Sequence, residues 1–79
     1  MTNTELLKQC LREKHFTLQK LADQLNISVS ALSRKINNKN EFKSIEINAI
    51  QQILKLSDKT RDIIFFATIV DLKSTNKGE

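Results

Sequence analysis

A shortage of turn-forming residues is the feature that most limits the fold of this chain of 79 residues. It contains no proline and a single glycine, Gly78, close to its end. Tight hairpins depend on glycine, proline and similar residues at fixed turn positions, so an all-β fold is not expected. A chain of this length also has room for only one small hydrophobic core. We therefore expect a single all-α domain.

Apolar residues recur every three or four positions in five segments, which is the spacing of one face of an α-helix. The first helix is predicted over about residues 3–14, and Thr2 with Glu5 has the spacing of a capping box. The other four helices each follow a serine or threonine, residue types that cap helix N-termini. These expected caps are Thr17, Ser28, Ser44 and Ser57.

The segments are assigned to one compact five-helix domain over residues 1–72, followed by a flexible polar tail at 73–79. The polar stretch 37–44 is predicted to be a loop, and Phe42 is its single apolar anchor. No stretch is long or apolar enough to span a membrane, and the N-terminus does not resemble a secretion signal.

The last predicted helix, about residues 58–72, carries more apolar residues than one stripe of a surface helix requires. One interpretation is that a second subunit or another partner covers part of it. The other is that this helix is the central core helix of a small domain. The candidate residues for a dimer or partner surface are Phe65, Phe66, Ile69 and Val70.

The segment 17–38 has the pattern of a short helix, a tight turn and a second helix. Ala22 is small where the two helices should cross, and Asn26 tolerates the left-handed conformation of a turn. Ile27 would fill the corner, and Leu32 would hold the second helix against the first. This arrangement leaves one face of the second helix free to enter the major groove of DNA.

This segment resembles the helix-turn-helix of the lambdoid phage repressor and Cro family, in particular the small proteins of Gram-positive temperate phages. Two departures from the family pattern stand out. Leu18 stands where a phosphate-binding glutamine is usual, with Gln19 one residue later, and asparagines replace the turn glycines at 26 and 38. The matching residues are Thr17, Leu21, Ala22, Leu25, Ile27, Ser28, Leu32 and Ser33.

The resemblance implies which residues would meet double-stranded DNA. Arg34 could bind guanine through its two-pronged guanidinium, and Val29 could lie against a thymine methyl group. The expected base contacts are Val29, Ser30, Ser33 and Arg34, and the expected backbone contacts are Gln19, Ser28, Lys35, Asn37, Lys39 and Lys43.

The charge balance agrees with a nucleic-acid partner. There are 13 Lys+Arg and 9 Asp+Glu, a net charge of +4.

His15 is the only histidine and Cys10 the only cysteine, which is too few for a metal site and leaves no catalytic triad. We expect no enzyme activity, no metal and no cofactor. Cys10 is read as a buried apolar residue in the reducing cytoplasm of a bacterial cell, where the protein would associate with the nucleoid.

Two functions stay open at this point. The first is a DNA-binding regulator of a phage-type lysis/lysogeny switch, working as a homodimer. The second is an antirepressor, or modulator of repression, that binds a partner phage repressor through its helix-turn-helix surface. Two features support the second function. The recognition helix has few residues that can distinguish bases, and Leu18, Val29 and Ala31 are expected to form a small apolar patch suited to a protein partner. A third and weaker option is an accessory protein, such as part of a toxin–antitoxin pair, because a fold does not fix a function.

Overall fold

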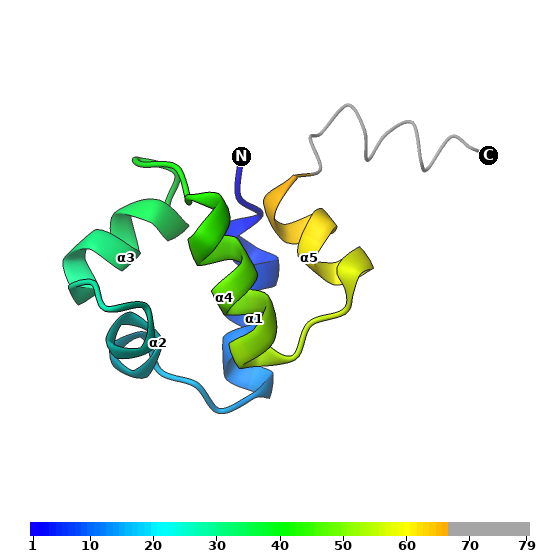
Figure 1. Ribbon diagram of the computed structural model, residues 1–79, viewed down its shortest axis with the longest axis horizontal. Coiled ribbons are helices and arrows are strands. Elements are labelled where there is room, and N and C mark those ends of the chain that lie inside the picture. Colours follow the sequence, from blue (N-terminus) through cyan, green and yellow to red (C-terminus); the bar gives the residue numbers. More distant parts are fainter. Residues whose placement is uncertain (67–79) are drawn as a thin grey trace.

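The computed structural model describes residues 1–66, which form five helices and no strand. In Figure 1, α2 and α3 lie on one side, α5 lies on the other, and α1 and α4 stand between them. The expected all-α, five-helix architecture is confirmed. The helices are α1 (Thr4–Glu13), α2 (Leu18–Leu25), α3 (Val29–Ile36), α4 (Ser44–Leu54) and α5 (Asp58–Phe65).

Every helix contributes at least one fully buried aliphatic side chain to a single core. Helix α2 packs against α3 and α4, while α5 packs against α1 and α4. No polar side chain of residues 1–66 is buried, so burial of apolar surface is the main stabilising force. The largest fully buried side chains are Leu7, Leu21, Leu32, Ile36, Ile50, Leu54 and Ile64.

Three of the expected helix caps are confirmed. The hydroxyls of Thr17, Ser28 and Ser57 accept hydrogen bonds from backbone N–H groups of the first turns of α2, α3 and α5. Each bond satisfies one of the donors that a helix leaves free at its start.

The other two expected caps are wrong, and in both cases the neighbouring residue takes the role. Helix α1 is capped by Asn3, whose Oδ1 accepts from the N–H of Leu6 at 3.1 Å. Thr2 lies outside the helix because its backbone is hydrogen-bonded to Asn38. Ser44 is the first residue of α4 rather than its cap.

Within residues 1–66, four residues other than glycine adopt positive φ angles, and they end helices α1 to α4. They stand where many proteins use glycine, which has no Cβ to clash in the left-handed region. Asn26 and Asn38 were predicted in this role. The four residues are His15 (φ 57°), Asn26 (φ 61°), Asn38 (φ 64°) and Lys55 (φ 55°).

Phe42 anchors the loop before α4, as predicted, and its partner is at the end of α5. Its ring meets that of Phe65 edge to face, with centroids 5.2 Å apart. Phe65 is only 6 % exposed, so it belongs to the core, and its assignment to a partner surface is wrong. Phe66 is 55 % exposed. The predicted continuation of this helix to residue 72, with Ile69 and Val70, and the tail at 73–79 lie outside the described residues.

Candidate nucleic-acid interface

The helix-turn-helix is built by α2, α3 and the three residues between them. The N–H of Ile27 donates to the carbonyl of Ala22 at 3.0 Å, and the left-handed Asn26 makes this return of the chain possible. Ala22 is fully buried in the core that α2 and α3 share. The predicted geometry of the turn is thus confirmed.

One face of α3 is fixed to the protein and the opposite face is open. Leu32 and Ile36 are 0 % and 1 % exposed, so they hold the inner face in the core. The outer face borders a shallow hollow, and this hollow gathers all four predicted base contacts with two of the predicted backbone contacts. Its lining residues are Val29, Ser30, Ser33, Arg34, Asn37 and Lys39.

Arg34 is the residue of this face best suited to reach a ligand. It is exposed, and every ion pair within residues 1–66 uses Lys35 or Arg61 as its cation. Its guanidinium therefore keeps its donors for a partner outside the chain. Lys39 also borders the hollow and is exposed as well.

The other predicted contact residues in the hollow and next to it differ in how far the protein itself engages their side chains. Val29 is half-buried and packs against the core. Asn37 donates from Nδ2 to the carbonyl of Ser33 at 3.0 Å, and this carbonyl also accepts the backbone N–H of Asn37 at 3.0 Å. Ser28 is exposed, and its hydroxyl caps α3 by accepting from the N–H of Ala31.

Lys35 has a structural role that the sequence analysis did not predict. Its ammonium lies 3.1 Å from a carboxylate oxygen of Glu46, and both side chains are only 12 % exposed. It also donates to the carbonyl of Glu41 at 3.3 Å. Because the ammonium is engaged within the protein, the assignment of Lys35 to DNA phosphate is corrected.

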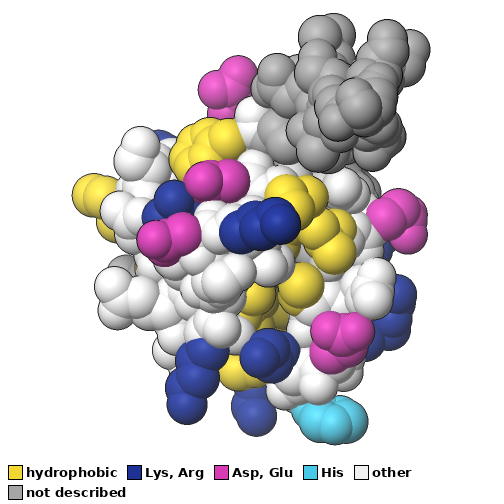
Figure 2. Space-filling model, turned by 90° about the vertical axis from the view of Figure 1, so that its right-hand side faces the viewer, with side chains coloured by type: hydrophobic (Ala, Val, Ile, Leu, Met, Phe, Trp, Pro, Cys, Tyr) yellow, Lys and Arg dark blue, Asp and Glu magenta, His cyan; other side chains and the backbone are white. Residues whose placement is uncertain are grey.

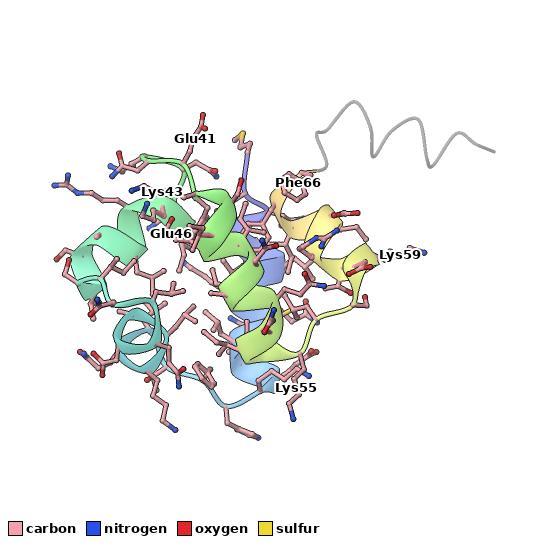
Figure 3. All side chains as sticks on the ribbon, viewed as in Figure 1. Glu41, Lys43, Glu46, Lys55, Lys59 and Phe66 are labelled. Atoms are coloured by element: carbon pink, nitrogen blue, oxygen red, sulfur yellow. The ribbon has the colours of Figure 1, made fainter. Side chains whose placement is uncertain are left out.

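Glu46 connects this ion pair to the start of α4. Its Oε1 accepts a hydrogen bond from the N–H of Lys43 at 2.8 Å, which closes one half of a capping box. Figure 3 shows Lys43 and Glu46 together where α3 meets the start of α4. Burial acts to raise the pKa of Glu46, but the bond from Lys43 and the neighbouring Lys35 ammonium outweigh it and lower this pKa below its usual value.

The other predicted backbone contacts, Gln19 and Lys43, do not line the hollow. Gln19 is exposed on α2, where its amide donates to Asp23 at 3.1 Å. Lys43 is exposed at the N-cap of α4.

The sequence analysis missed two residues that hold the neighbouring segments in place, Glu46 and Asn38. The spacing of Lys43 and Glu46 is that of a capping box and was available in the sequence. The link between Asn38 and Thr2 joins residues 36 positions apart and left no local signal.

A comparison with protein families identifies a match to the Mga helix-turn-helix domain over residues 2–68. The chain belongs to this family. Membership supports a small helix-turn-helix DNA-binding regulator, whereas the narrower assignment to the repressor and Cro family stays a prediction. Comparisons with curated proteins and with solved structures found no match.

The side of the molecule that carries α5 differs from the α3 face in the types of side chain it exposes. Figure 2 views the side that carries α5 and shows apolar atoms near its centre, with charged side chains of both signs around them. Within residues 1–66, no helix is long and apolar enough to cross a membrane, and no three potential metal ligands come together.

Proposed function

We propose that this protein regulates transcription by placing α3 in the major groove of double-stranded DNA. The observation that carries the proposal is the division of α3 into two faces. Leu32 and Ile36 are buried, while the opposite face presents the exposed Arg34 and Ser30 in an open hollow. A helix that enters the groove needs this combination of a fixed back and a free front.

The proposed base contacts are the four residues of the hollow named from the sequence. Arg34 would donate two hydrogen bonds to O6 and N7 of a guanine, and half-buried Val29 would offer its outer methyl to a thymine. Ser30 and Ser33 can donate to several bases and would discriminate little between them. The proposed phosphate contacts are Gln19, Ser28, Asn37, Lys39 and Lys43, of which the two lysines supply the charge.

In its finer form, the proposal is a Cro-like switch protein of phage type, acting as a homodimer on an operator in a bacterial cell. Two recognition helices would then lie about 34 Å apart, one turn of DNA. The exposed Phe66 supports a subunit contact near the end of α5. Ile69 and Val70 complete the proposed contact from the sequence alone.

The alternative function, an antirepressor that binds a partner repressor, has less support. It relied on an apolar patch of Leu18, Val29 and Ala31 at the helix-turn-helix surface. All three side chains are half-buried, and Leu18 and Val29 pack against the core. Little of the expected patch is left for a protein partner, so we favour DNA.

The test is a fluorescence-anisotropy titration of the purified protein against DNA from its own upstream control region, at two salt concentrations. We expect saturable binding that weakens steeply as salt increases. Arg34→Ala should weaken binding roughly 5- to 150-fold, the value of a lost bidentate base contact.

Arg12→Ala is the matched control, because Arg12 is an exposed arginine on α1 and lies outside the hollow. It removes the same charge and should leave affinity nearly unchanged. A folded wild-type protein that bound none of this DNA at low salt would refute the proposal. A titration against the partner repressor would follow.

A further inference from the structure

The residues before α1 form a strap that joins the two ends of the molecule. The N–H of Asn3 donates to the carbonyl of Ile64 near the end of α5 at 2.6 Å. One residue earlier, Thr2 bonds to the segment that follows α3. In Figure 1 the N-terminal segment, in blue, accordingly passes between the loop before α4 and the end of α5.

Asn38 is the centre of the contact with α3. Its Oδ1 accepts from the N–H of Thr2 at 2.7 Å, and its Nδ2 donates to the carbonyl of Thr2 at 3.0 Å. The side-chain amide thus binds one residue of the strap as a neighbouring β-strand would. The hydroxyl of Thr4 adds a third bond, donated to the carbonyl of Ile36 at 2.6 Å, and accepts a longer fourth bond from Nδ2 of Asn38 at 3.4 Å.

This contact lies directly beside the proposed DNA-binding surface. Asn38 is left-handed, and this turn lets the N–H of Lys39 donate to the carbonyl of Arg34 at 2.8 Å. Lys39 and Arg34 both border the hollow on the outer face of α3. A shift of Asn38 would therefore move Lys39 relative to Arg34.

We infer that Asn38 is a positioning residue for DNA binding, which holds the end of α3 and Lys39 in place by anchoring them to the N-terminal strap. The inference rests on the proposed function and adds a residue that touches no DNA itself. Its physical basis is preorganisation. A phosphate contact that is held in place before binding loses less conformational freedom when the complex forms.

The test separates the amide of Asn38 from its backbone conformation. Asn38→Gly keeps the left-handed turn, which glycine adopts readily, and removes both bonds to Thr2. We expect this variant to bind DNA about threefold to tenfold more weakly, because Lys39 is no longer held in position for its phosphate contact. The slope of log affinity against log salt should also fall by about one, because one phosphate contact is lost.

The control is His15→Gly, which changes another exposed left-handed residue, at the end of α1. It should leave both affinity and salt slope unchanged. Thr4→Val removes the third bond to α3 by a different route and should weaken binding in the same direction. It also provides the answer if Asn38→Gly fails to fold.

The outcomes are distinct. Wild-type protein that binds no DNA would refute the proposed function. Wild-type binding with an unchanged salt slope and affinity in Asn38→Gly and Thr4→Val would overturn the inference alone. A lower melting temperature in these variants with unchanged DNA binding would make the strap a purely stabilising element, and this too would overturn it.

Discussion

The ion pair of Lys35 and Glu46 leads to a quantitative prediction about stability. The charged atoms are 3.1 Å apart and each side chain is 12 % exposed. Coulomb's law with an effective dielectric constant near 20 gives an attraction of about 5 kcal/mol, most of which offsets the loss of hydration. Glu46→Gln keeps an oxygen for the N–H of Lys43 but leaves the ammonium without its counter-charge. We expect it to lower the free energy of unfolding by about 1–2 kcal/mol, between values for exposed and buried pairs.

The assay is urea denaturation followed by circular dichroism at pH 7 and at lower pH. The pKa of Glu46 is lowered in the folded protein. The stability from its charge is therefore complete above its unfolded pKa, and it is lost as the pH falls through the folded pKa. The wild type should lose more stability on acidification than Glu46→Gln does, and the two should converge at low pH.

Lys35→Met is the matching variant, because it removes the ammonium and keeps an apolar stem of similar length. Combined with Glu46→Gln it should recover part of the loss, since no unpaired charge is left. Two results would refute the reasoning: a Glu46→Gln variant as stable as the wild type at pH 7, or one whose stability varies with pH as the wild type's does.

Two further substitutions test the helix ends, each by thermal and urea unfolding. Ser28→Ala removes the cap of α3 and should cost about 1 kcal/mol, whereas an equally stable variant would show that this bond contributes nothing. Lys55→Gly relieves a left-handed residue after α4 and should stabilise by roughly 0.5–1 kcal/mol. Lys8→Gly, in the interior of α1, makes the same change of residue type with the opposite expected sign, and equal effects would contradict the argument.

The sequence was sufficient for features that depend on neighbours along the chain. Helical spacing of apolar residues predicted the five helices, and the hydroxyls of Thr17, Ser28 and Ser57 predicted three of their starts. Asn26 was predicted as a left-handed turn because its side chain tolerates that conformation. All of these preferences act within one turn of helix, so a single sequence displays them.

Apart from the cap of α4, where Ser44 was expected and the adjacent Lys43 is found, the errors lie where distant segments meet. Thr2 has the spacing of a capping box, yet its backbone is taken by Asn38, and Asn3 caps the helix instead. Lys35 carries the charge of a phosphate-binding residue, but Glu46 neutralises it within the fold. Phe65 fits the stripe of a partner surface and instead packs against Phe42. In each case, a tertiary contact decided between two roles that the local pattern allowed equally.

The two faces of α3 explain how such a small domain can combine a fixed fold with an adaptable binding surface. The inner face is held by Leu32 and Ile36, and its end by Lys35 on one side and the strap on the other. The exposed residues Ser30 and Arg34 take no part in these contacts. Under the proposed function, substitutions there would change which bases are bound at little cost in stability, because exposed positions away from caps and ion pairs are usually near neutral. By contrast, substitutions at Asn38 or Glu46 alter how the same surface is held.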